Sequence, residues 1–192
     1  MPDPAFPARP AVASDRELLD RLRAGDQEAF EVVFRSHYPQ LVGFAEAILR
    51  AREPAEDAAQ DVMLELWRRR QEIVLETSLR AYLLRATRNR ALNQIRHRRV
   101  AERVRPEAPG TGAAPSADQD LAEQELSAAV ARAVSDLPER CREVFELSRG
   151  HGLKYAEIAQ VLGISIKTVE TQMGRALRVL RERLSPWLSE GG

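Results

Sequence analysis

Cysteine is nearly absent from this sequence. Cys141 is the only one in 192 residues, so an intrachain disulfide framework is excluded. No segment without a charged side chain exceeds ten residues, as in 36–45, whereas a membrane-spanning helix needs about twenty apolar residues. Phosphate-binding, zinc-protease and nucleophile-elbow motifs are also lacking. We therefore expect no membrane span, no metal, no cofactor and no enzymatic chemistry.

The N-terminal segment has no apolar stretch of signal-peptide length. It carries four prolines within its first ten residues instead, a composition typical of a loose tail rather than a targeting signal. We expect residues 1–25 to form a flexible N-terminal tail and the protein to stay in the cytoplasm.

An excess of charge of one sign is also missing. Lys and Arg total 29, as do Asp and Glu, and a net charge of zero argues by itself against nucleic-acid binding. The charges are nevertheless segregated. Residues 53–65 hold five acidic and no basic side chains, 81–105 hold eight arginines against one glutamate, and 106–126 hold five acidic and no basic side chains. Such blocks suggest separate surfaces for separate partners.

Apolar residues recur at three- and four-residue steps in most of the chain, whereas the alternation typical of strands is missing. This period predicts helices over 30–49, from 54 to 67 and from 79 onward, and then over 137–149, 155–162 and 166–184. Residues 105–119 are rich in Pro, Gly, Ala and Ser and predict a linker. The predicted fold is all-α, with small helical domains at 26–100 and 126–188 joined by a flexible linker at 101–125.

The segment 155–180 predicts a helix-turn-helix in the C-terminal domain. Gly163 suits the positive φ of a sharp turn, Ser165 can cap the second helix, and Ala159 is small where the two helices cross. The outer face of the second helix can then enter a major groove. Its candidate DNA-binding residues are Ser165, Lys167, Thr168, Glu170, Thr171, Arg175 and Arg178.

Two segments in a fixed order identify a family resemblance. AEDAAQDVMLELW at 55–67, followed by SLRAYLLRATRNRALNQIRHRR at 78–99, resembles region two of extracytoplasmic-function (ECF) sigma factors, a group within the sigma-70 family. LPERCREVFELSRGHGLKYAEIAQVLGIS at 137–165 resembles region four. The resemblance implies a subunit that binds core RNA polymerase and promoter DNA, recognises the minus-ten and minus-thirty-five elements and starts transcription of a specific regulon. It also makes an anti-sigma factor an expected type of partner, although no residue identifies one.

The acidic block at 53–65 is the candidate polymerase-binding face. Two carboxylates four residues apart on one helix repel each other by a few tenths of a kcal/mol, so the stripe suits a basic partner. The resemblance makes that partner the clamp helices of the largest polymerase subunit. A merely solvated helix face is the alternative. The candidate contacts are Asp57, Gln60, Asp61 and Leu64.

The arginine-rich segment is the candidate minus-ten site. Arginines neutralise phosphates without reading sequence, while an aromatic ring and an amide can stack on and read an unpaired base. In the family, this helix and the loop before it hold a flipped base of the non-template strand. Tyr82 could equally pack against the first helix. The candidate residues are Tyr82, Arg85, Arg88, Asn89, Arg96, Arg98 and Arg99.

Several alternatives remain open from sequence. Glu170 either accepts a hydrogen bond from a cytosine, or points to water or pairs with Gln172 or Arg175 and reads nothing. The acidic linker either only tethers the domains or, as the resemblance implies, threads the polymerase cleft. A stand-alone helix-turn-helix regulator that binds operators is the alternative function. A nuclease that holds a metal with the 53–65 block lacks a second carboxylate cluster.

Overall fold

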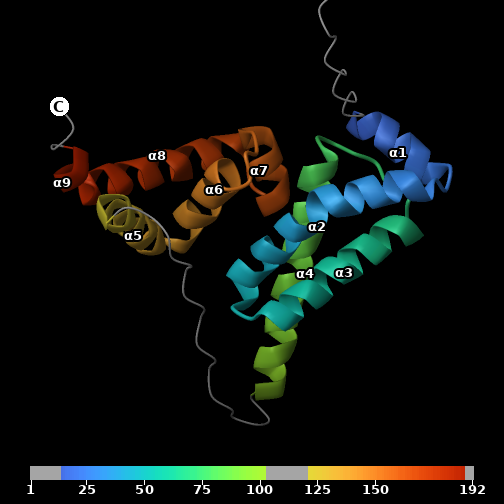
Figure 1. Cartoon of the computed structure of the whole chain (residues 1–192), viewed down its shortest axis with the longest axis horizontal. Helices are drawn as coiled ribbons and strands as arrows, with labels where there is room; N and C mark the ends of the chain where they lie inside the picture. The colour runs from blue at the N-terminus through green and yellow to red at the C-terminus, as the bar shows by residue number, and fades with distance from the viewer. Residues whose placement is uncertain (1–13, 103–120, 189–192) are drawn as a thin grey trace, which may run out of the picture.

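A computed structural model describes residues 14–102 and 121–188 of the chain. Within these ranges the protein is all-α with no strand, as the sequence predicted. Figure 1 shows one group of helices formed by the first half of the chain and a second group formed by the last third. The helices are α1 (Asp15–Arg23), α2 (Gln27–Leu49), α3 (Arg52–Arg68), α4 (Leu79–Glu102), α5 (Leu121–Ser135), α6 (Glu139–Arg149), α7 (Tyr155–Leu162), α8 (Ile166–Arg183) and α9 (Ser185–Leu188).

The N-terminal helices form a bundle in which α2 packs against both α3 and α4. The carboxylate of Asp26 starts α2 by accepting hydrogen bonds from the backbone N–H groups of Glu28 and Ala29, which satisfies two donors of the first turn. The inner face of α3 carries the fully buried alanines 55, 58 and 59. Because these side chains are small, α3 can lie close to α2. The larger aliphatic and aromatic residues of α2 pack against both α3 and α4.

Helix α1 lies where the sequence analysis expected a flexible tail. Ser14 and Glu17 form a reciprocal cap at its start, and Leu18, Leu19 and Leu22 are buried in the core. The expectation for residues 14–25 is therefore corrected, because three leucines on one face give this segment enough apolar surface to pack. Residues 1–13 lie outside the described part of the chain.

The C-terminal helices contain the predicted helix-turn-helix. Gly163 ends α7 with φ +66°, in the left-handed region that glycine adopts without strain. Ser165 caps α8 by accepting a hydrogen bond of 3.1 Å from the N–H of Thr168. Ala133, Leu137, Cys141, Ala176 and Leu180 form a small core between α5, α6 and α8.

The helices continue further toward the middle of the chain than the sequence indicated. Helix α4 runs to Glu102 and α5 begins at Leu121, so both helices extend into the expected linker at 101–125. The remainder of that linker, residues 103–120, lies outside the described ranges.

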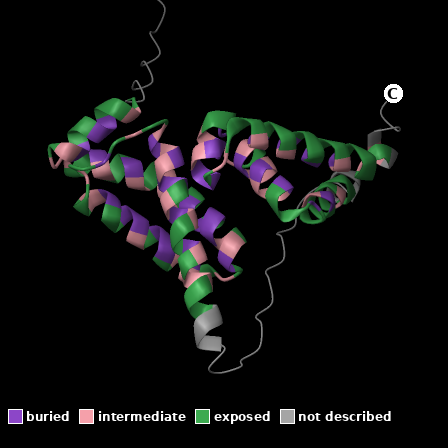
Figure 2. Cartoon of the chain, turned by 180° about the vertical axis from the view of Figure 1, so that it is seen from behind, coloured by how far each residue is buried: buried purple, intermediate pink, exposed green. Residues whose placement is uncertain are grey.

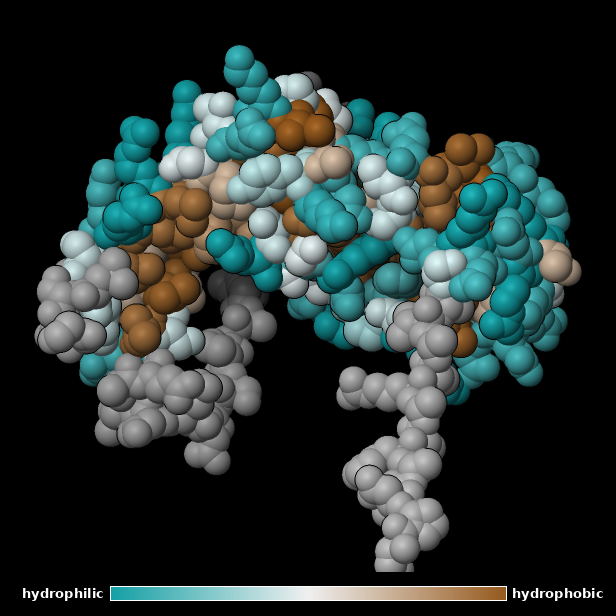
Figure 3. Space-filling view, turned by 90° about the horizontal axis from the view of Figure 1, so that it is seen from above, coloured by the Kyte–Doolittle hydropathy of each residue, from teal (hydrophilic) through white to brown (hydrophobic). Residues whose placement is uncertain are grey.

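Burial follows the faces of the helices, with buried residues on their inner sides and exposed residues outside (Figure 2). Seen from above, hydrophilic side chains cover much of the surface, but hydrophobic side chains emerge at the end that holds α5 and α8 (Figure 3). The exposed large hydrophobic residues of these two helices are Leu126, Val130, Ile166 and Leu177. No helix in the described ranges is long and apolar enough to cross a membrane.

Candidate nucleic-acid interface

A groove of about 290 Å³ separates α3 from α4. Tyr82 lines it, and its ring is half-buried against the core. The ring therefore packs against the core on one side and remains accessible to a ligand on the other, so the two alternatives considered for it do not exclude each other. Burial also raises the pKa of the Tyr82 phenol, which keeps the hydroxyl protonated as a hydrogen-bond donor. The other lining residues are Asp61, Val62, Glu65, Ala86, Asn89, Arg90 and Asn93.

Asp61 belongs to the wall of this groove as well as to the predicted polymerase-binding stripe. Its carboxylate lies 2.6 Å from the guanidinium of Arg90 on α4, and both side chains are about half exposed. Sequence analysis missed Arg90 and Asn93 as groove residues. Their spacing could have revealed them, because Asn93 follows Asn89 by one helical turn.

The predicted minus-ten residues divide into two groups on α4. Arg85, Asn89, Arg96 and Arg98 are exposed, as a phosphate- or base-binding face requires. Arg88 is not: its side chain is 12% exposed and its guanidinium binds the carboxylate of Glu143 on α6 at 2.9 Å. The side chain of Arg99 lies outside the described part.

The predicted polymerase-binding stripe forms a surface of α3. Asp57, Gln60 and Leu64 are exposed, with Leu64 at 49%. The Gln60 amide lies 3.4 Å from the hydroxyl of Tyr38 on α2, at the long end of hydrogen-bond distance. Within the described ranges, no three His, Cys, Asp or Glu side chains gather as metal ligands. The stripe thus places one apolar side chain, Leu64, among exposed polar ones on the surface of α3.

The predicted face of the recognition helix α8 is open to solvent. Its core side is formed by Val169, Met173 and Ala176. On the other side, Thr168 is half-buried. The remaining predicted residues are exposed: Ser165, Lys167, Glu170, Thr171, Arg175 and Arg178.

Glu170 has no hydrogen bond or ion pair among the described residues, so neither of the two intramolecular pairings considered for it is present. One of those partners, Gln172, is engaged elsewhere, because its Oε1 accepts a hydrogen bond of 3.1 Å from the thiol of Cys141. Glu170 is therefore exposed to solvent without an intramolecular partner among the described residues, and the alternatives of base contact and plain solvation both remain.

The two domains touch through α4 and α7, a contact that the sequence did not predict. Thr77 and Ser78 of the loop before α4 bind Gln160 and Glu157 of α7. His151 stacks edge-on against Phe44 of α2, with ring centroids 5.2 Å apart. Contacts of this kind between distant segments leave no periodic signal in a sequence.

Comparison with known proteins identifies the family of both halves. The family model of sigma-70 region 2 matches residues 33–100, and that of sigma-70 region 4 matches residues 127–180. The ECF RNA polymerase sigma factor SigM of Mycobacterium tuberculosis is 34% identical over 178 residues, which cover 93% of this chain and 88% of that protein. The ECF RNA polymerase sigma factor SigK of Mycobacterium bovis is 31% identical and covers 91% of this chain and 96% of its own length.

Solved structures share the fold. CnrH, in complex with the cytosolic domain of CnrY, is 26% identical with a TM-score of 0.61 and covers 94% of this chain and 100% of its own. The sigma factor RpoE of Bartonella quintana, in complex with the anti-sigma factor NepR, is 24% identical with a TM-score of 0.64 and covers 81% of this chain and 96% of its own. Two matching family models in the predicted order do not favour a stand-alone regulator. The chain belongs to the ECF sigma factors of the sigma-70 family, the subunits through which RNA polymerase recognises promoters.

Proposed function

We propose that this sigma factor divides its work among three surfaces. The α3 stripe of Asp57, Gln60, Asp61 and Leu64 binds core RNA polymerase. Helix α4 and its groove bind the single-stranded minus-ten element, and the outer face of α8 binds the minus-thirty-five duplex. The groove beside the exposed arginines of α4 is the observation that supports this division most directly, because it places a hollow for a base next to cations for the backbone.

The groove has the chemistry of a site for an unpaired base. Tyr82 offers an aromatic ring for stacking, and the amides of Asn89 and Asn93 offer both donors and acceptors for a base edge. Its volume of about 290 Å³ lies at the lower end of the range for small-ligand sites, which suits one base. Arg85 and Arg96 are exposed on the same helix and are placed to neutralise adjacent phosphates.

Helix α8 has the chemistry of a duplex reader. Ser165 and Lys167 lie at its N-terminal end, where recognition helices contact base edges. Arg175 and Arg178 follow about two and three turns after Lys167 and are available to the backbone. Glu170 is the one acidic residue among the predicted contacts, and a carboxylate in a major groove can accept a hydrogen bond from cytosine N4.

Two related proteins of known structure were solved in complex with a partner protein. CnrH and RpoE were solved with CnrY and NepR, and we propose an anti-sigma factor of this general kind for the present chain. Because it works with RNA polymerase and promoter DNA, we propose that it acts in the cytoplasm. The acidic residues 107–118, which lie outside the described ranges, are proposed to enter the polymerase cleft.

The groove is tested by truncating one exposed amide. The promoter is first found by sequencing the transcripts made when the chain is overproduced. Holoenzyme containing Asn89→Ala should bind core normally but open that promoter less, as measured by permanganate reactivity of unpaired thymines. Gln27→Ala removes an exposed amide from α2 and should behave as wild type. Unchanged opening by Asn89→Ala would remove the groove from the proposal.

The α3 stripe is tested by reversing one charge. Asp57 is exposed and, unlike Asp61, has no ion-pair partner within the described residues, so Asp57→Arg changes the surface without disturbing the groove. Co-purification with core polymerase should be lost while helical content is kept. Glu28→Arg is the control, because Glu28 is 90% exposed at the start of α2. Equal retention of both variants on core would contradict the assignment.

A further inference from the structure

Helix α1 binds both ends of segment 71–79, the loop that leads into α4, which runs beside it (Figure 1). The family model of region 2 begins at residue 33, so α1 lies outside that match. We propose that α1 is nevertheless part of the minus-ten site, with Asp15 and Arg23 as positioning residues that fix this loop and the first turn of α4. The inference rests on the role that the proposed function gives to the groove beside α4.

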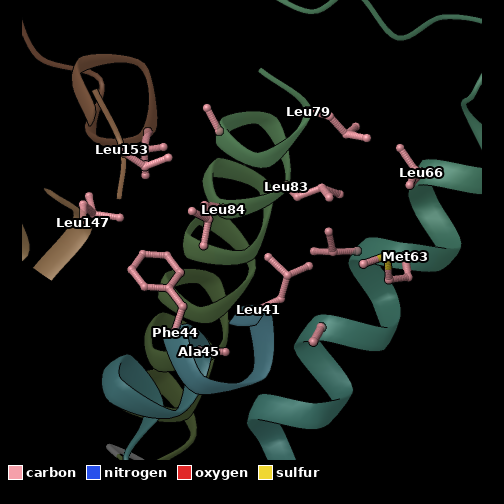
Figure 4. Packing of buried hydrophobic residues seen from close by; sticks show 14 of the residues in the cluster. Leu41, Phe44, Ala45, Met63, Leu66, Leu79, Leu83, Leu84, Leu147 and Leu153 are labelled. Carbon is pink, nitrogen blue, oxygen red and sulfur yellow. The ribbon is translucent and has the colours of Figure 1, made fainter. Parts of the chain in front are cut away.

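The carboxylate of Asp15 holds the end of the loop where α4 begins. Its Oδ2 accepts a hydrogen bond of 2.8 Å from the backbone N–H of Leu79, whose side chain lies in the core toward Leu66 of α3 (Figure 4). The hydroxyl of Ser78 accepts a second hydrogen bond, from the N–H of Ala81 at 3.1 Å. Two donors of the first turn are thus satisfied, and the negative charge of Asp15 also suits the positive end of the helix dipole.

The guanidinium of Arg23 holds the other end of the loop. One terminal nitrogen donates a hydrogen bond of 2.6 Å to the backbone oxygen of Ile73, a residue with a buried side chain. The other terminal nitrogen lies 3.1 Å from the carboxylate of Asp20, which keeps the guanidinium oriented. In return, the amide of Gln71 donates to the backbone oxygen of Arg23. Hydrogen bonds from a charged donor are about twice as strong as neutral ones, so this end is firmly held.

Helix α1 is itself fixed in the domain and can serve as a frame. Leu18, Leu19 and Leu22 are buried in the core. Asp15 and Arg23 are the first and last residues of the helix, so they bind the loop from two points about 12 Å apart along the axis. A loop bound at two points on a packed helix keeps one position, which lowers the entropy lost when a ligand binds beside it.

The held loop leads directly to the groove. Tyr82, which lines the groove, follows the N–H bound by Asp15 by three residues, so a shift of the helix start moves this ring. Asn89 lies almost three turns further along α4 and does not depend on the helix start. Residues 76–78 in the middle of the loop contact α7, whereas both contacts with α1 lie within the N-terminal domain.

The first experiment asks whether α1 holds the loop in the full chain. Hydrogen exchange of peptides covering 71–82 reports opening of the loop and of the first turn of α4. Asp15→Ala and Arg23→Ala should each speed exchange there about tenfold and leave peptides of α2 and α3 unchanged. Arg16→Ala is the matched control, because Arg16 is exposed on the same helix and has no hydrogen bond or ion pair among the described residues. It should exchange as wild type.

Two results of this experiment would overturn the proposal. Unchanged exchange in both variants would mean that the loop keeps its position without these side chains. Equal acceleration in α2 and α3 would mean that α1 only stabilises the domain. Asp15→Asn keeps an acceptor oxygen and Arg23→Lys keeps a charged donor, so each should restore most of the protection that the corresponding alanine variant loses.

The second experiment asks whether the position of the loop matters for DNA. Holoenzymes are compared on the promoter identified by transcript sequencing, and opening is measured by permanganate reactivity. If the loop is correctly placed for only part of the time, opening falls by that fraction, and we expect about a fivefold loss for Asp15→Ala and Arg23→Ala. Affinity for core polymerase and for a duplex minus-thirty-five probe should stay at the wild-type value. A parallel loss of core affinity would show a purely structural role and refute the proposal.

Asn89→Ala separates this inference from the function on which it rests. If Asn89→Ala and Arg23→Ala both leave opening unchanged, the groove is not the minus-ten site, and the proposed function fails together with the inference. If Asn89→Ala lowers opening while Arg23→Ala speeds loop exchange without lowering opening, the groove stands and only the positioning role of α1 is refuted.

Discussion

Helices α4 and α8 are both basic on the outside, yet they differ in what surrounds their cations. On α4, Arg88 is held by Glu143 and Arg90 by Asp61, and a groove runs along one side. On α8, no ion pair engages Lys167, Arg175 or Arg178 within the described residues. Two of the cations of α4 therefore already have partners within the protein, whereas these three cations of α8 have none among the described residues.

The difference also fits the form of nucleic acid that each helix would bind. An unpaired base needs a hollow with an aromatic wall, which α4 shares with α3. A duplex needs a convex helix that fits the major groove, which α8 provides by resting on α7 and α6.

The largest effect should come from Gly163→Val, which removes the α8 reader. A β-branched residue at φ +66° is a strong conformational outlier, and we expect a loss of about 3 kcal/mol of stability. Thermal unfolding should show a lower midpoint, and duplex binding should fall with it. Co-purification with core polymerase should remain, since α3 lies in the other domain. An unchanged unfolding midpoint would show that the turn tolerates a side chain.

Glu170→Gln tests whether α8 reads a base or only repels phosphates. We expect a relaxed preference at one upstream base pair, worth about 1–2 kcal/mol for a single contact, and no change at the other positions. Affinities for a set of single-base variants of the minus-thirty-five element measure this. A uniform gain for every sequence would instead mean that only a negative charge had been removed.

Arg85→Ala and Arg175→Ala should affect opposite ligands. Each arginine is exposed and is expected to neutralise one phosphate, so its loss should reduce the salt slope of binding by about one. Arg85→Ala should weaken binding to a labelled single-stranded DNA probe, and Arg175→Ala should weaken binding to a labelled duplex probe. Titrations of both variants with both probes at several salt concentrations complete the comparison. Equal effects on both probes would break the division between the helices.

The smallest effect should be a weak pH dependence of the contact between the two domains. Burial, with help from Arg80 on α4, lowers the pKa of His151 from its usual 6.5, so the protein binds fewer protons with the domains in contact than with them apart. The contact is therefore unaffected above about pH 6.5 and weakened as the pH falls below that value. FRET between dyes on cysteines introduced at the exposed Glu53 and Arg181, in a Cys141→Ser background, should decline there.

His37 on α2 is also buried, and burial again lowers its pKa, with Asp15 acting in the opposite direction and Arg80 in the same one. The control for the pH prediction is therefore His151→Phe, which keeps a ring against Phe44 and leaves His37 in place. A decline of the same size in this variant would assign the effect to His37 or to another group.

Much of the fold could be predicted from sequence because it depends on local signals. The period of apolar residues located the helices, and Gly163 and Ser165 marked the turn and the cap of the helix-turn-helix where the structure has them. The failure at α1 has a specific cause. The prolines at the start of the chain predict a loose segment, but Leu18, Leu19 and Leu22 follow them and pack on one face.

The candidate surfaces were predictable only as far as one helix determines them. The outer face of α8 follows from its period, whereas the groove needs α3 and α4 side by side. The pairing of Arg88 with Glu143 joins residues 55 positions apart and could not be found from sequence. In the sequence, nothing distinguishes Arg88 from the other arginines of its helix, because its partner lies on α6.

The exposed face of α8 has a consequence for how this protein changes over generations. The core of the domain rests on the opposite side of the helix, so most of these side chains, apart from the cap Ser165 and the half-buried Thr168, add little to folding. On the proposed function, substitutions there can change the set of genes under its control at little cost in stability. Substitutions on α7 are more constrained, since that helix supports α8 and also meets α4. Promoter choice would then change more easily by mutation than the packing of the helices beneath it.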